Sequence, residues 1–160
     1  ELKQSRDERN NAFLNNNKRE RENKVLEERI REYGISPSRS RIQKYRLWEE
    51  SNHLCFYCGQ PVGAAEFLSG SGVEIEHIIP RSLLFDDSYA NKVCSCRKCN
   101  AEKGNSTAYD YMKAKPEGDF EDYLKRIETF FSEKRISKAK RDKLLTPATD
   151  IPQDFIDRQL

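Results

Sequence analysis

Two C-x-x-C pairs constrain the fold of this chain more than any other feature of its sequence. Cys55 and Cys58 form the first pair, and Cys96 and Cys99 form the second. Two tight turns that each supply two thiolates suit a tetrahedral Zn²⁺ ion, with Zn–S distances of about 2.3 Å. Because sulfur then fills all four positions, we expect a structural zinc site that closes residues 59–95 into a loop.

These cysteines also allow other interpretations, namely a redox C-x-x-C motif or buried free thiols. A redox motif usually lies at a strand-to-helix junction of a βαβ unit, and the sequence predicts no such unit. The chain has five cysteines, and this odd number argues against a complete set of internal disulfides. We expect the remaining Cys94 to face a small core and His53 to be a surface histidine rather than a ligand.

The composition limits the classes of protein to which the chain can belong. Hydrophobic residues make up 36% and charged residues 35% of its 160 residues, a lean mixture for a core. The formal net charge is only +2, so a nucleic-acid partner is indicated at most by the basic cluster at residues 134–143. No apolar run approaches the roughly 18 residues of a membrane span, and the N-terminus has no apolar signal region. We therefore expect a soluble cytoplasmic protein with no membrane partner.

Helices are expected along most of the chain. Residues 1–33 predict a long solvated helix ending at Gly34, and a second helix should follow from Ser36 to about Asn52. Residues 61–72 and 81–90 are expected to be loops, and short strands are expected at 73–79 and 91–95. Further helices are predicted after Cys96, from Thr107, from Asp119 and from Ser137. The helix from Asp119 is the clearest amphipathic one, with an apolar face formed by Phe120, Tyr123, Leu124, Ile127, Phe130 and Phe131.

An acid and a histidine stand side by side in the first predicted strand. Glu76 and Asn100 carry the hard oxygen donors that Mg²⁺ prefers, and His77 can accept a proton near neutral pH. Taken singly, a strand histidine is usually a satisfied core residue, and such an asparagine is usually a helix cap. Brought together by the zinc loop, the three residues favour phosphodiester hydrolysis. In this interpretation Glu76 and Asn100 bind Mg²⁺, with Mn²⁺ as an alternative, and His77 acts as general base.

The strand geometry places a condition on this site. Neighbours on an ideal strand point to opposite faces, so Glu76 and His77 reach one phosphate only where the strand twists strongly or ends. Pro80 is close enough to end it. We therefore expect Glu76 and His77 at an exposed rim, and Lys103 and Arg81 as exposed basic residues within reach of phosphate.

The order of these residues resembles the HNH, or ββα-metal, nuclease family. The family has an acid–histidine pair on the first strand, an asparagine on the second, here Asn91, and an asparagine on the following helix, here Asn100. More narrowly, VEIEH, DDSYANKV and NAEKGN resemble the HNH domain of type II CRISPR-associated RNA-guided DNA endonucleases, in a compact zinc-bearing branch. Glu76 departs from the commoner aspartate and moves the carboxylate by about one bond.

The resemblance implies an α+β fold, a small ββα-metal core with a four-cysteine zinc site, surrounded and flanked by α-helices. It assigns His77 as general base, Glu76 and Asn100 as metal ligands, and Asn91 as a residue that orients the His77 segment. It also implies an N-terminal helical linker at 1–35, the nuclease domain at 36–133, and a linker at 134–160 toward a neighbouring RuvC-like nuclease domain.

In the type II CRISPR-associated endonucleases, the HNH domain cuts the target DNA strand that is paired with the guide RNA. The expected partners are therefore a guide RNA–target DNA heteroduplex and the RuvC-like domain, in a monomer that serves antiviral defence in a prokaryotic cell. Two alternatives remain. One is a free-standing HNH homing or restriction endonuclease, which should carry its own base-reading element. The other is a non-catalytic zinc module that binds nucleic acid.

Overall fold

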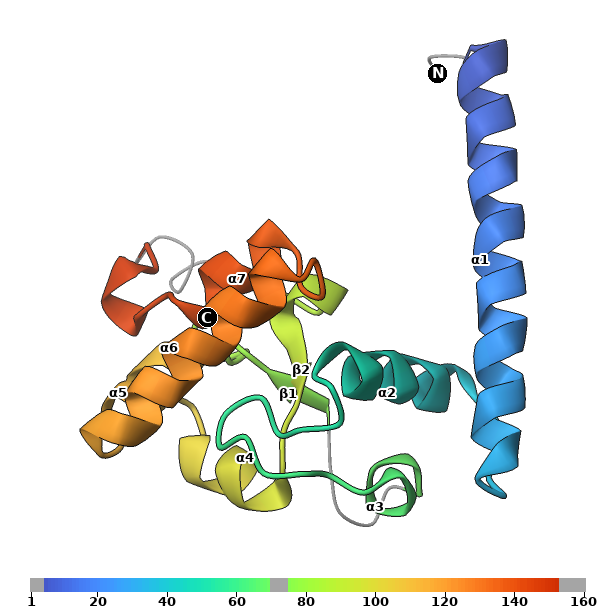
Figure 1. The fold of residues 1–160 in the computed structure, drawn as a ribbon. Helices are drawn as coiled ribbons and strands as arrows, with labels where there is room; N and C mark the ends of the chain where they lie inside the picture. Colours follow the sequence, from blue (N-terminus) through green and yellow to red (C-terminus); the bar gives the residue numbers. More distant parts are fainter. Residues whose placement is uncertain (1–4, 70–74, 153–160) are drawn as a thin grey trace.

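The structure is a computed structural model that describes residues 5–69 and 75–152. A two-stranded hairpin lies in the middle of the body, with helices around it, and one long helix projects from the body (Figure 1). The elements are α1 (Arg6–Glu32), α2 (Arg39–Glu50), α3 (Ala64–Leu68), β1 (Ile75–His77), η1 (Tyr89–Asn91), β2 (Lys92–Cys94), α4 (Arg97–Lys103), α5 (Ala108–Lys113), α6 (Glu117–Ser132), α7 (Lys138–Leu144) and η2 (Ala148–Asp150). The predicted α+β fold, a ββα unit surrounded by helices, is confirmed.

Side-chain caps begin most of the predicted helices. The hydroxyl oxygens of Ser38, Thr107 and Ser137 accept hydrogen bonds from the backbone at the starts of α2, α5 and α7, as residues of this type do at N-caps. Helix α6 begins at Glu117, two residues before the predicted start at Asp119. The predicted loop at 61–72 contains α3, because Phe67 and Leu68 are buried in the core and give this short turn a packed face.

Helix α1 is solvated along most of its length, as predicted. Ser5 and Glu8 form a reciprocal capping box at its start, and Gly34, with φ of +75°, follows its end. Ile30 is buried at the end that meets α2, whereas Phe13 and Leu14 are more than half exposed. The helix therefore joins the core only through its last turns (Figure 1).

The hairpin fixes the residues that flank the candidate site. Strands β1 and β2 are antiparallel, with Glu76 opposite Val93 and His77 opposite Lys92. The first strand is shorter than the predicted 73–79, and residues 73 and 74 lie outside the described residues. Asn91 was expected on the second strand but ends the turn η1 just before it, because its side chain binds the backbone of Ile79.

The C-terminal part of the described chain packs into the same core as the hairpin. On α6, Tyr123, Ile127 and Phe130 are buried, which confirms the predicted apolar face. Ile136 and Leu144 are also buried in this core. Although residues 134–150 are charge-rich, they form a packed cover on the body. None of the described helices is long and apolar enough to cross a membrane.

Candidate metal and nuclease site

The first cysteine pair lies in a tight knuckle that follows α2. The backbone N–H of Cys55 donates to the carbonyl of Gln60 at 2.8 Å, and that of Gly59 donates to the carbonyl of Cys55 at 2.9 Å. Gly59 has φ of +74°, a conformation that glycine adopts without a Cβ clash. The local turn thus aims Cys55 and Cys58 in one direction.

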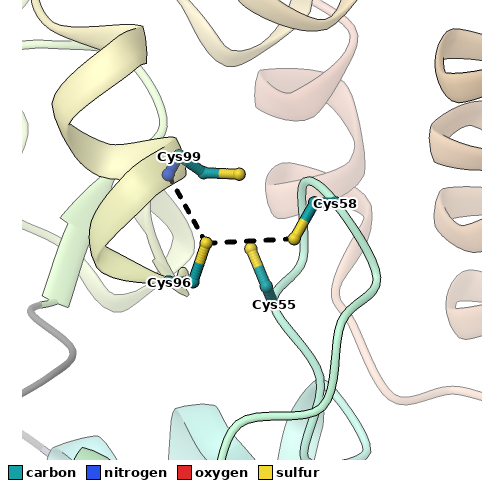
Figure 2. Close-up of side chains that lie close together, drawn as sticks. All are labelled: Cys55, Cys58, Cys96 and Cys99. Carbon is teal, nitrogen blue, oxygen red and sulfur yellow. Dashed lines mark hydrogen bonds between the residues drawn. The ribbon is translucent and has the colours of Figure 1, made fainter.

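The second pair lies at the start of α4. Cys96 is the N-cap residue of this helix, and its sulfur accepts a hydrogen bond from the Cys99 backbone N–H at 3.4 Å. Figure 2 shows the two pairs facing each other from separate parts of the chain. The first turn of α4 therefore serves as the second half of the cluster.

The four sulfur atoms have the spacing of a tetrahedral metal site. They all lie within 4.8 Å of one another, and the Sγ atoms of Cys58 and Cys96 are 3.8 Å apart. Zn–S bonds of about 2.3 Å in a tetrahedron give a sulfur–sulfur distance of about 3.8 Å. Hydrogen bonds from Cys55 and then Cys99 lower the pKa of Cys58, which favours the thiolate form that binds a metal. The spacing of the four sulfur atoms fits the predicted structural zinc site.

The two other candidate ligands lie elsewhere. Cys94 is fully buried in the core, and burial raises the pKa of its thiol to about 12. The imidazole of His53 stacks on Trp48 with ring centroids 3.5 Å apart, and its Nε2 lies 3.1 Å from Glu49. Both residues therefore have the structural roles that the sequence indicated.

Glu76 is buried rather than placed at an exposed rim, so that expectation was wrong. Only 7% of the residue is exposed, and its Oε1 accepts a hydrogen bond from Lys103 Nζ at 2.6 Å. The expectation of an exposed Lys103 was wrong for the same reason. Because Glu76 points to the strand face that α4 covers, the lysine of that helix neutralises it.

His77 has a different neighbourhood, although it follows Glu76 directly. Its side chain is one quarter exposed, and Nε2 lies 2.9 Å from Oδ1 of Asp87. Asp87 also contacts Lys92 Nζ at 3.3 Å and Arg81 Nη2 at 3.8 Å. Sequence reasoning gave no role to Asp87, and the only available signal was its place in the DDSYANKV stretch.

Asn91 holds the segment that follows His77. The residue is fully buried, and its side-chain amide both accepts from the Ile79 N–H at 2.9 Å and donates to the Ile79 carbonyl at 3.0 Å. The same Nδ2 donates to the carbonyl of Asp86 at 2.8 Å. One side chain thus joins the end of the first strand to the loop that carries Asp87.

Replacing Asn91 should therefore destabilise the domain. In Asn91→Ala, two buried backbone groups of Ile79 lose their partner, and each unsatisfied group costs about 1–3 kcal/mol. Asn91→Asp keeps the shape but places an acceptor against two carbonyl oxygens, so we expect it to be no more stable than the alanine variant. Urea unfolding followed by circular dichroism measures both. A variant Asn91→Asp with the stability of the parent would contradict this role.

Asn100 lies on α4, next to the second cysteine pair. It is half-buried, and its backbone N–H donates to the carbonyl of Cys96 at 3.0 Å. Lys103 follows three residues later on the same helix, so Asn100 and Lys103 share a helix face. That face meets Glu76. The structure thus places the helix that carries Asn100 against Glu76 and the backbone of His77, through Lys103.

The oxygen donors beside β1 suit a hard divalent cation. Lys103 Nζ contacts the Glu76 carboxylate at 2.6 Å and the backbone carbonyl of His77 at 2.9 Å, so a cationic group already lies among oxygen acceptors here. Carboxylate, carbonyl and amide oxygens are also the ligands of Mg²⁺. For Glu76 to bind a metal, its carboxylate must either contact the metal and Lys103 at the same time or break its ion pair with Lys103.

Helix α7 contacts the loop that carries Asp87. Lys143 Nζ lies 2.8 Å from Oδ2 of Asp86, and Oδ1 of Asp86 accepts from the Ser88 N–H at 2.9 Å. Burial, the largest single effect, raises the pKa of Asp86, but the hydrogen bonds from Lys143 and Ser88 and the charge of Lys143 together outweigh it, and the pKa falls to about 2. The C-terminal cover therefore fixes the position of this loop.

The comparisons with known proteins identify the family to which the chain belongs. Residues 55–109 match the family model of the HNH endonuclease, and this range contains both cysteine pairs and all four candidate catalytic residues. The chain belongs to the HNH endonuclease family. Nucleases of this family use a divalent metal ion.

Within the family, the chain is homologous to the HNH region of Cas9. It is 32% identical over 123 residues to the CRISPR-associated endonuclease Cas9 1 of Streptococcus thermophilus, covering 73% of this chain and 11% of that protein. It is also 32% identical over 125 residues to Cas9 of Staphylococcus aureus, covering 74% of this chain and 12% of that protein. The chain therefore spans only about a tenth of the length of these relatives.

Solved structures show the same fold. A crystal structure of S. thermophilus Cas9 in complex with the GGAA PAM matches with a TM-score of 0.70 and 22% identity, over 99% of this chain and 17% of that one. The type II-C Cas9 of Actinomyces naeslundii matches with a TM-score of 0.69 and 21% identity, over 89% of this chain and 15% of that one.

Proposed function

We propose that this chain is the nuclease domain that cuts the guide-RNA-paired strand of target DNA in an RNA-guided endonuclease. The observation that carries the proposal is the similarity to Cas9 over 73% of the chain, combined with His77 and the oxygen donors around β1. Its partners would be the RNA–DNA heteroduplex and a neighbouring RuvC-like nuclease domain. The protein would act as a monomer in antiviral defence, in the cytoplasm of a prokaryotic cell.

The proposed reaction is hydrolysis of one phosphodiester bond. His77 takes a proton from a water molecule, the water oxygen bonds to phosphorus, and the bond from phosphorus to the 3′ oxygen breaks. The 3′ oxygen takes up a proton from solvent, which leaves a 5′ phosphate and a 3′ hydroxyl. Glu76 and Asn100 would hold Mg²⁺, or Mn²⁺ in its place, which neutralises charge on the scissile phosphate. Asn91 would keep the His77 segment in position through its bonds to Ile79.

The four-cysteine cluster would hold Zn²⁺ in a structural role. With all four ligand positions filled by sulfur, such an ion keeps no open position for water. Its contribution would be to hold α4 against the knuckle at residues 55–58, and so to present Asn100 beside the first strand.

The chain would divide into three parts. Residues 1–35 would be a helical linker, residues 36–133 the nuclease domain, and residues 134–160 a linker toward the RuvC-like domain. The solvated surface of α1 supports the first assignment. The packing of Ile136 and Leu144 in the core indicates that the beginning of the third part moves with the nuclease domain.

Replacing His77 tests the proposed function. We expect His77→Ala to reduce Mg²⁺-dependent cleavage of the RNA-paired strand by about 10²–10⁴-fold, the usual contribution of a general base. Single-turnover cleavage of a labelled strand, in the complex with guide RNA, measures the effect. His53→Asn is the matched control, because His53 is the only other histidine and asparagine tolerates its φ of +63°. Parental activity of His77→Ala would reject the base assignment, whereas a parent that shows no metal-dependent cleavage would favour a non-catalytic zinc module.

A further inference from the structure

The side chain of Asp87 contacts the imidazole that the proposed function uses as a base. Oδ1 of Asp87 lies 2.9 Å from His77 Nε2, in a loop ten residues further along the chain. We propose that Asp87 is a positioning residue, which fixes His77 in the form that carries its proton on Nε2 and leaves Nδ1 as the basic nitrogen. This inference rests on the proposed function, because it concerns the same histidine.

The chemistry of the pair determines which ring nitrogen carries the proton. An ionised carboxylate only accepts hydrogen bonds, so the partner nitrogen must donate. Nε2 of His77 is therefore protonated, and Nδ1 keeps its lone pair in the neutral ring. The nitrogen bound to Asp87 cannot take a proton from water, whereas Nδ1 can. When Nδ1 becomes protonated, the nearby carboxylate also stabilises the imidazolium.

The surroundings of Asp87 keep it ionised. The hydrogen bond with His77, followed by the one with Lys92, lowers the pKa of the Asp87 carboxyl group. Lys92 lies directly opposite His77 in the hairpin register, and its side chain is only 10% exposed. This lysine therefore approaches Asp87 from the same strand pair that carries the histidine.

The backbone around Asp87 is held on both sides. The preceding residue, Asp86, is bound through its carbonyl by Asn91 and through its carboxylate by Lys143. The following residue, Ser88, donates its N–H to Asp86 at 2.9 Å. The Asp87 side chain is 53% exposed, so its ion pairs add little to stability. An exposed acid in a loop that is anchored at several points fits a role in orientation rather than in folding.

The test is Asp87→Asn, which keeps the size of the side chain and removes its charge. The asparagine amide can donate to Nε2 as well as accept from it, so the preference for a proton on Nε2 is lost. By analogy with partners that orient metal-binding histidines, where replacement costs about 10–100-fold, we expect the cleavage rate at saturating substrate to fall by about this factor, with KM nearly unchanged. In ¹⁵N NMR spectra of the zinc-loaded chain, we expect His77 to change from the form protonated on Nε2 to a mixture of both tautomers.

The chain provides a matched control in its other histidine. His53 Nε2 lies 3.1 Å from the carboxylate of Glu49, which repeats the same pairing on the surface. Glu49→Gln should change the ring signals of His53 and leave both the His77 signals and the cleavage rate unchanged. This control separates the effect of losing any carboxylate–histidine pair from the effect at the candidate site.

The outcomes distinguish this inference from the proposed function. If His77→Ala is inactive while Asp87→Asn cleaves like the parent, the positioning role is wrong and the base assignment stands. Parental His77 spectra in Asp87→Asn would overturn the inference whatever the cleavage rate. If His77→Ala retains full activity, His77 is not the general base, and both the proposed function and the role of Asp87 in catalysis are wrong. Since the spectra are recorded without substrate, they report on the tautomer in either case.

Discussion

Cys58→Ser should lose bound zinc and unfold at a much lower urea concentration than the parent. Cys58 is exposed, so replacing its sulfur by the smaller serine oxygen leaves no cavity in the core. The loss of stability therefore reports on metal binding alone. Structural zinc contributes about 10–16 kcal/mol to the folding of zinc-finger peptides. Loss of one of four thiolates removes a large part of such a contribution. Metal content and urea unfolding on the same sample measure the two effects together.

The control for this variant is Cys94→Ala. Cys94 is buried but lies outside the four-cysteine cluster, so we expect this variant to keep its zinc and to lose only the packing of one sulfur. A further test is removal of zinc from the parent by a chelator, which should reproduce the unfolding of Cys58→Ser. If Cys58→Ser stayed folded without zinc at parental stability, the cluster would not hold the fold together.

Lys103→Met should destabilise the domain by about 3–5 kcal/mol, the usual cost of breaking a buried ion pair by removing one of its two charges. The Lys103 side chain is fully buried and that of Glu76 is 9% exposed. Methionine fills most of the space of the lysine chain but cannot neutralise the carboxylate. Urea unfolding without added Mg²⁺ gives the free energy of unfolding for the comparison.

Two further variants isolate the charge effect. In the double variant Lys103→Met with Glu76→Gln, neither charge of this pair remains, so most of the lost stability should return. Lys115→Met removes an ion pair with Glu102 of similar length, 2.7 Å, whose side chains are 30% and 38% exposed. It should cost less than about 1 kcal/mol. Equal stability of Lys103→Met and the double variant would show that Glu76 is not a buried charge in the folded state.

Local sequence signals predicted many features of the fold correctly. Thr107 and Ser137 begin helices, as predicted, because their side-chain oxygens satisfy backbone N–H groups a few residues away. The second helix has its cap at Ser38, two residues after the predicted start at Ser36. The spacing of the cysteines predicted the metal cluster for a similar reason, since each pair needs only its own turn to aim two sulfurs. Short α3 was missed because its helical form depends on burial of Phe67 and Leu68 by other elements.

The sequence by itself determined the kinds of chemical group at the candidate site, namely four thiolates, an acid, an imidazole and amides, together with the turns that carry them. Only the tertiary structure decided which groups meet. Lys103 pairs with Glu76 across 27 residues, and Asp87 rather than a neighbour of His77 in the chain contacts the imidazole. The physical reason is that these contacts depend on how α4 and the 86–91 loop pack against one short hairpin. Such packing lowers the free energy of the whole core. It depends on contacts between residues that are distant in the sequence, so no local pattern of residues specifies it.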